Sequence, residues 1–216
     1  MSAGKNRENE KALPGDGQRL YHAFGPLFDE RSEILILGSF PSVKSREQMF
    51  YYGHPQNRFW KVVAALCEEM ESYMPFCVED KTPVPHRTEG KIRVPQTVKE
   101  KKALLIAHRI ALWDVIASCE ITGSSDSSIR NAEVNDLSVI LGAAPVRRIG
   151  VNGSTAFRLF EKYMSPQLKA YGLTMNDVVK LPSTSPANAA WSAERLTESW
   201  STLLQGLTSD SPPEAR

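Results

Sequence analysis

The segment that decides the fold, residues 33–60, reads EILILGSFPSVKSREQMFYYGHPQNRFW. An unbroken apolar run, ILIL, follows Glu33 and stops at Gly38. A run without polar alternation is typical of a central parallel strand that is covered on both faces. Gly38 then allows a tight turn and a close approach of the backbone to a ligand. The segment therefore predicts a buried strand at residues 33–37.

Two irregular loops follow this strand, at residues 39–42 and 51–57. One interpretation is that their aromatic residues only plug the top of a sheet. That interpretation does not explain the polar residues that crowd into the same stretch, Ser39, His54, Gln56 and Asn57. Polar side chains beside apolar ones at the carboxyl end of a buried strand are typical of a pocket. We therefore favour a pocket over a plug.

Composition sets wide limits on the class of protein. The 216 residues, 41% of them hydrophobic and 24% charged, suffice for one ordinary globular domain. No apolar run approaches the roughly 20 residues of a membrane helix, and the N-terminal sequence lacks the apolar core of a secretory signal. The three cysteines have no CxxC spacing, so we expect free thiols in a reducing, intracellular compartment (the cytoplasm of a prokaryote or the nucleus of a eukaryote). A net charge of +1 argues against gripping long nucleic acids by charge alone.

Expected strands and helices alternate along the chain. Further strands are expected at 110–116, 148–151 and 178–181, and helices at about 58–71, at 97–109 and 135–142, and after Ser154 and Ser192. Thr97 and Glu100 have the spacing of a capping box at the start of the second helix. Short strands that are apolar on both faces, separated by helices, predict an α/β sandwich with a mostly parallel sheet.

One domain is expected over residues 17–207, between polar tails at 1–16 and 208–216 that we expect to be disordered. Three segments fall outside the pattern of strands and helices. We expect a surface insertion at about 72–95, a polar loop at 117–130, and a cap on the sheet edge at 19–30.

The carboxyl ends of the four expected strands share a polar or glycine-bearing character: Gly38-Ser39-Phe40, Trp113-Asp114, Asn152-Gly153 and Ser183-Thr184-Ser185. Each group alone is explained by a turn, a helix cap or a rigid loop. Together they indicate one site, because ligands of open parallel sheets bind beyond the carboxyl ends of the strands.

This rim lacks the motifs of several enzyme classes. No Walker loop, GxGxxG or GxSxG sequence follows a strand, and the four histidines show no metal-ligand spacing. Carboxylates are too scarce for a paired-carboxylate glycosidase, and no cofactor or metal is expected. Asparagines, serines, a histidine and Phe40 remain. Such residues can hydrogen-bond the edge of a flat heteroaromatic base and stack on its face.

The sequence resembles the hypoxanthine (deoxyinosine) DNA glycosylases, a family of the uracil-DNA glycosylase superfamily, in five ordered motifs: GSFPS (38–42), YYGHPQNRFW (51–60), ALWDVI (111–116), GSSDSSI (123–129) and LPSTSPANA (181–189). The resemblance implies a three-layer α/β/α sandwich with a central four-stranded parallel sheet. It also implies a monofunctional glycosylase that flips a deaminated base out of single- or double-stranded DNA. We expect the protein to be a monomer. The enzyme would cut the N-glycosidic bond with water, leaving an abasic site for base excision repair.

The resemblance assigns roles residue by residue. The catalytic residue falls at Asn57, inside YYGHPQN rather than in the superfamily's usual first motif, and the stacking aromatic falls at Phe40. We expect the base to be bound by Gly38, Ser39, Phe40, Pro41, His54, Asp114 and Asn152. We expect DNA to be contacted by Ser183, Thr184, Ser185, Asn188, Lys44 and Arg58.

The chemistry of these residue types leaves two choices open. The amide of Asn57 does not titrate near neutral pH, so it either orients a water through its oxygen or donates to the departing base through its nitrogen. The O6 atom of hypoxanthine is expected to face a backbone N–H of the loop from Gly38 to Pro41. Alternatively, Asp114 accepts the N1–H of the base.

Three rival functions are compatible with the same residues. A glycosylase of this fold can act chiefly on uracil, including uracil in mismatches. A module of the same fold can bind nucleic acid without cutting it. A flavodoxin-like protein can bind a free nucleotide or flavin without DNA.

Overall fold

The computed structural model describes residues 19–73, 87–88, 91–122, 128–205 and 207. Its centre is a parallel sheet of four strands in the order β5–β2–β8–β9. Every residue of the two neighbouring strands β2 and β5 is buried, as their apolar runs predict. The strands are β2 (Ile34–Gly38), β5 (Ile110–Asp114), β8 (Arg148–Asn152) and β9 (Val178–Leu181).

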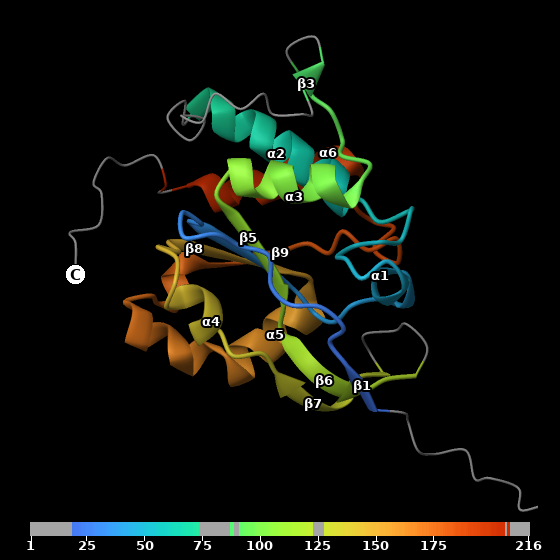
Figure 1. Ribbon diagram of the computed structural model, residues 1–216, viewed down its shortest axis with the longest axis vertical. Helices are drawn as coiled ribbons and strands as arrows, with labels where there is room; N and C mark the ends of the chain where they lie inside the picture. The colour runs from blue at the N-terminus through green and yellow to red at the C-terminus, as the bar shows by residue number, and fades with distance from the viewer. Residues whose placement is uncertain (1–18, 74–86, 89–90, 123–127, 206, 208–216) are drawn as a thin grey trace, which may run out of the picture.

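Helices cover both faces of this sheet, which confirms the predicted three-layer sandwich (Figure 1). One face carries α2 (Phe59–Tyr73), α3 (Val98–Ala107) and α6 (Ala193–Trp200). The other carries α4 (Ser138–Leu141) and α5 (Ser154–Tyr163). Short helices lie in the connections: α1 (Val43–Glu47) and the 3₁₀ helices η3 (Ser165–Tyr171), η4 (Met175–Asp177) and η5 (Ser201–Leu204).

Local sequence signals place several helix ends. Thr97 and Glu100 form the expected capping box, although α3 ends at Ala107 rather than at residue 109. The helix expected at 135–142 shrinks to the four residues of α4. Cys67 and Cys119 are both buried in the core. No helix in the described part of the chain is long and apolar enough to cross a membrane.

A second, antiparallel sheet corrects the expectation of a polar loop at residues 117–130. The strand β6 (Ile116–Glu120) pairs with β1 (Arg19–Tyr21) on one side and with β7 (Arg130–Val134) on the other. The polar residues of this stretch bond across the strands. The hydroxyl of Ser118, for example, accepts from Arg19 at 2.8 Å and donates to Glu133 at 2.6 Å.

The strand expected at 110–116 is therefore two strands, β5 and β6, separated at Val115. The segment 19–30 covers the edge of the parallel sheet as expected, because Leu27 forms an isolated antiparallel bridge with Leu112 of β5. Much of the predicted insertion lies outside the described residues, although β3 (Arg87–Thr88) and β4 (Lys91–Ile92) pair within it. Both predicted tails also lie outside them, so the domain limits stay predictions.

The turn from β8 into α5 depends on a glycine. Gly153 has φ 99° and ψ 157°, a region of backbone conformation that only glycine adopts readily. A Cβ at this position would also lie 3.2 Å from the Cβ of Ser183.

We predict that Gly153→Ala lowers the free energy of unfolding by about 1–3 kcal/mol, because alanine is strained in this conformation. Gly25→Ala is the matched control, since a Cβ at Gly25 would have no heavy atom within 4 Å. Urea unfolding followed by tryptophan fluorescence measures both variants. Equal stability of the two would contradict the assignment of strain to Gly153.

Candidate functional site

The carboxyl ends of all four parallel strands open into one cavity of about 780 Å³. This convergence is the one that the strand-end sequences predict. Tyr51, Tyr52, Asn57 and Asn188 are among the other residues that line it. The strand ends contribute Gly38 to Ser42, Asp114, Asn152 to Thr155 and Leu181 to Ser185.

The floor of the cavity is formed where β2 and β5 end side by side. The register pairs Gly38 with Asp114. A Cβ on Gly38 would lie 2.2 Å from Oδ1 of Asp114 and 2.8 Å from the hydroxyl of Tyr52, which is closer than atoms can approach. A glycine is therefore required for these two side chains to occupy the floor.

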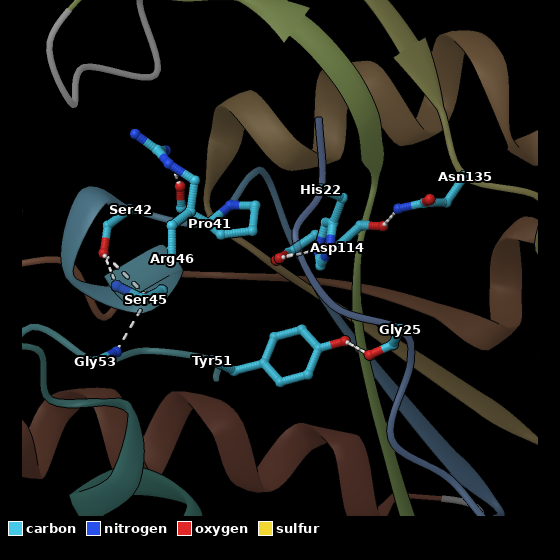
Figure 2. A network of polar contacts seen from close by, with 10 residues as sticks. All are labelled: His22, Gly25, Pro41, Ser42, Ser45, Arg46, Tyr51, Gly53, Asp114 and Asn135. Carbon is cyan, nitrogen blue, oxygen red and sulfur yellow. Dashed lines mark hydrogen bonds and ion pairs between the residues drawn. The ribbon is translucent and has the colours of Figure 1, made fainter. Parts of the chain in front are cut away.

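Asp114 is held by a histidine that the sequence analysis did not assign to the site. Its Oδ2 accepts a hydrogen bond from Nε2 of His22 at 2.8 Å, and its backbone oxygen accepts one from the side chain of Asn135 at 2.9 Å (Figure 2). The side chains of His22 and Asp114 are only 5% and 6% exposed. The ring of His22 also packs edge-on against Phe24 and Phe40.

Aromatic residues line the cavity beside this pair. Phe40 is almost completely buried, and the guanidinium of Arg46 lies 5.8 Å from its ring centre while donating to the oxygen of Pro41 at 2.6 Å. The hydroxyl of Tyr51 donates to the oxygen of Gly25 at 2.8 Å (Figure 2). Burial raises the pKa of Tyr51 far above its ordinary value, and the negative charge of Asp114 raises it further. Tyr51 is thus a neutral phenol at physiological pH, which excludes it as a general base.

Asn57 lies on the wall, with the oxygen and the nitrogen of its side-chain amide in different environments. Its Oδ1 accepts a hydrogen bond from the backbone N–H of Phe59 at 2.9 Å, at the start of α2. The atom that faces this N–H must be the oxygen, because the backbone amide is a donor. Nδ2 has no hydrogen-bond partner among the described residues. A substrate in the cavity therefore meets a donor at Asn57.

The side chain of Asn152 connects its own strand end to Tyr52 and Thr184 by hydrogen bonds. Its Nδ2 donates to the hydroxyl of Tyr52 and to Oγ1 of Thr184, each at 3.0 Å, and its Oδ1 accepts from the backbone N–H of Thr184 at 3.1 Å. Tyr52 is stacked on Phe59 with ring centres 3.7 Å apart. Both donor hydrogens of Asn152 are thus used within the protein. The structure places Asn152 and the buried Thr184 as supports of the wall, where the sequence assigned them to base and DNA.

Arg58 differs most from its expected place at the DNA interface. Its guanidinium donates to backbone oxygens of the loop between β9 and α6: Thr184 (3.4 Å), Ser185 (2.6 Å), Asn188 (3.0 Å) and Trp191. The loop turns these carbonyls inward around one cation. The guanidinium of Arg58 is therefore bonded within the protein, where it supports the loop.

The other residues predicted to contact base or DNA differ in where they lie: some line the cavity and others lie off its wall. The side chain of Asn188 turns inward and donates to the oxygen of Ser183 at 2.8 Å. The hydroxyls of Ser183 and Ser185 accept backbone N–H groups within the loop and also line the cavity. His54 and Lys44 lie off the cavity wall: His54 accepts the N–H of Gln56, and Lys44 pairs with Glu47 at 2.7 Å.

Sequence comparison places this chain among known proteins. Residues 26–204 match the model of the uracil DNA glycosylase superfamily, which covers the whole parallel sheet and the cavity. The chain therefore belongs to the uracil DNA glycosylase superfamily.

Two relatives and one solved structure show which members of the superfamily this chain is similar to. A hypoxanthine DNA glycosylase of Methanosarcina acetivorans is 33% identical over 184 residues, covering 84% of this chain and 96% of the relative. A hypoxanthine DNA glycosylase of Methanosarcina barkeri is 30% identical over 123 residues, covering 56% of this chain and 63% of the relative. The NMR structure of a Methanosarcina acetivorans protein, provisionally assigned as a uracil DNA glycosylase, is 31% identical with a TM-score of 0.63, covering 88% and 99% of the two chains.

We predict that Arg58→Met loosens the loop without unfolding the sheet, because four backbone oxygens lose a cationic donor. Hydrogen bonds to charged groups contribute about 1.5–3 kcal/mol each. Amide hydrogen exchange over residues 182–191 should accelerate at least about tenfold. Arg158→Met, at an exposed position on α5, is the control. Unchanged protection of the loop in Arg58→Met would show that the guanidinium does not hold it.

Proposed function

We propose that this protein is a DNA glycosylase that removes deaminated bases, chiefly hypoxanthine, from DNA and leaves abasic sites. The observation that carries the proposal is the amide of Asn57, which keeps its oxygen on the start of α2 and leaves Nδ2 to the cavity. The superfamily membership and the two relatives named hypoxanthine DNA glycosylases support it.

The chemistry assigned to Asn57 is stabilisation of the departing base. The bond between C1′ of the sugar and the base breaks with its electron pair on the base, so negative charge grows there and positive charge grows on the sugar. Water then adds to C1′ and releases a proton to the solvent, and the departed base anion takes up a proton. A fixed donor aimed at the developing negative charge contributes about 2.7–4 kcal/mol, or roughly 100- to 1,000-fold in rate. The bonded oxygen favours this role over the orientation of water.

The surrounding wall suits a flipped purine. The ring of Phe40 and the neutral Tyr51 provide apolar surface against which a base can stack. The backbone N–H of Phe40 has no hydrogen-bond partner among the described residues, and we assign it as the donor to O6 of hypoxanthine. An N–H at this position matches a carbonyl at C6 and opposes the amine that adenine carries there.

A chain with a net charge of only +1 is suited to contacting a few phosphates rather than a long stretch of the DNA backbone. The hydroxyls of Ser183 and Ser185, on the rim of the cavity, are assigned to the DNA backbone. Of the three cationic residues near these motifs, Arg46, Lys44 and Arg58, we assign the positive charge toward DNA to Arg46, because it lines the cavity and the other two do not.

Uracil excision is the second candidate, supported by the superfamily's name and by the solved structure assigned to the uracil DNA glycosylases. Both substrates would use the same cavity and the same amide. Duplexes with one inosine or one uracil, treated with hot alkali after incubation, separate them. Cleavage at uracil alone would overturn hypoxanthine as the main substrate. DNA binding without cleavage of either would favour a non-catalytic module.

We predict that Asn57→Asp cuts the single-turnover rate of inosine excision roughly 100- to 1,000-fold, because a carboxylate cannot donate to the base. Its stability should stay close to wild type, since the carboxylate still accepts from the N–H of Phe59. Asn57→Ala should lose the rate and also about 0.5–2 kcal/mol of stability with the cap. Activity retained in Asn57→Asp would rule out the donor role.

A further inference from the structure

The buried contact between His22 and Asp114 lies at the substrate cavity but belongs to neither the wall supports nor the proposed chemistry. Asp114 is 4% exposed, and Oδ2 has the ring of His22 as its partner at 2.8 Å. Taking a carboxylate out of water costs several kcal/mol unless its oxygens are hydrogen-bonded. One oxygen meets this condition within the protein.

The second carboxylate oxygen of Asp114, Oδ1, is not hydrogen-bonded in this way. It has no hydrogen-bond partner among the described residues, and Asp114 lines the cavity. Oδ1 lies directly over the backbone of Gly38, where a Cβ would approach it to 2.2 Å. The protein thus fixes a carboxylate in a nearly closed wall and leaves one acceptor for whatever occupies the cavity.

We infer that His22 and Asp114 select the base by its edge: Oδ1 of Asp114 accepts a ring N–H adjacent to a carbonyl, and His22 is the positioning residue that holds Asp114 in place. The inference rests on the proposed function and specifies its substrate class. Phe40 and Asp114 both line the cavity, so the N–H of Phe40 and Oδ1 of Asp114 would offer a base one donor and one acceptor. Hypoxanthine offers the complementary pair, O6 and N1–H.

Adenine presents the opposite pattern on the same edge, an amine at C6 and a lone pair on N1. An ionised carboxylate only accepts hydrogen bonds, so it meets the lone pair of adenine with repulsion. A site built around one hydrogen-bonding pattern rejects analogues that leave its polar groups unpaired. Guanine carries the same edge as hypoxanthine, and the easier opening of a mispaired inosine separates these two bases.

His22 lies off the cavity wall but is placed to orient the carboxylate of Asp114. It follows β1 and reaches Asp114 across 92 residues of sequence. Its N–H on Oδ2 fixes which oxygen turns to the cavity, and its ring edge packs on Phe40. Nδ1 is buried without a hydrogen-bond partner among the described residues, so the contact with Asp114 is the polar anchor of the ring.

Binding to uncleavable DNA tests the inference without requiring turnover. Two duplexes carry one 2′-fluoroarabino nucleotide each, with hypoxanthine in one and unsubstituted purine, which has neither O6 nor N1–H, in the other. Fluorescence anisotropy gives the Kd of each duplex with the full-length protein. Wild type should bind the hypoxanthine duplex at least tenfold more tightly than the purine duplex.

We predict that Asp114→Asn lowers this preference roughly 10- to 100-fold. The amide oxygen should take the N–H of His22, which turns the NH₂ group toward the cavity. This donor opposes N1–H of hypoxanthine and suits the lone pair on N1 of purine. The Kd for the purine duplex should therefore stay the same or improve. An equal weakening of both duplexes would show a merely structural role and overturn the inference.

The two variants of His22 form a matched pair. His22→Gln keeps an N–H donor within comparable reach and should retain most of the preference for hypoxanthine. His22→Leu keeps the volume without the donor and should lose about tenfold of it. Equal preferences in the two variants would overturn the positioning role.

Excision of ordinary inosine by wild type is measured in parallel. Wild type that neither cuts inosine nor distinguishes the two duplexes would refute the proposed function. Wild type that cuts inosine while Asp114→Asn keeps its preference would refute this inference alone.

Discussion

The site depends on the close contact between the backbone of Gly38 and the two side chains that lie over it. Strand β2 ends in register with β5, so Gly38 and Asp114 lie next to each other, and Tyr52 reaches over both. From Tyr52 the contacts continue to Asn152 at the end of β8 and to Thr184 after β9. One hydrogen-bonded series thus joins the loops of three strands around the space above one glycine.

Most polar groups in this rim serve the protein rather than a ligand. The amide of Asn152 and the guanidinium of Arg58 are occupied by the loop after β9. Rigid support of this kind is what a site needs when its few functional groups must be held in place before the substrate arrives. Among the groups of the described residues that are left to the cavity are Nδ2 of Asn57, Oδ1 of Asp114 and the N–H of Phe40.

Sequence alone predicts the parts of this arrangement that depend on local pattern. The apolar runs of β2 and β5 and the turn at Gly38 leave few alternatives to a buried parallel sheet with a site at its carboxyl edge. The second sheet escaped prediction because Ser118 and Glu133 look like loop residues until they are paired across strands. Local polarity does not reveal a cross-strand partner.

Side-chain partners that are distant in sequence account for the rest. A cationic residue beside a DNA-binding motif suggests a phosphate contact, but Arg58 is turned inward by carbonyls about 130 residues away. The sequence around His22 does not indicate that it belongs to the site, because its partner there, Asp114, is 92 residues away. The individual functions of Asn57 and Asp114 likewise depend on which of their atoms are already bonded, which sequence does not encode locally.

Selectivity and catalysis make opposing electrostatic demands on this cavity. In the proposed reaction, cleavage places negative charge on the base, while the role proposed for Asp114 brings a carboxylate to the edge of that base. The hydrogen bond from His22 draws negative charge toward Oδ2, away from the cavity. In the proposed mechanism, the donors of Asn57 and Phe40 add attraction on other sides of the base. The proposed reading of N1–H by Asp114 is compatible with a negatively charged leaving group only if these donors offset the carboxylate, which would link the proposed role of His22 to the chemistry proposed for Asn57.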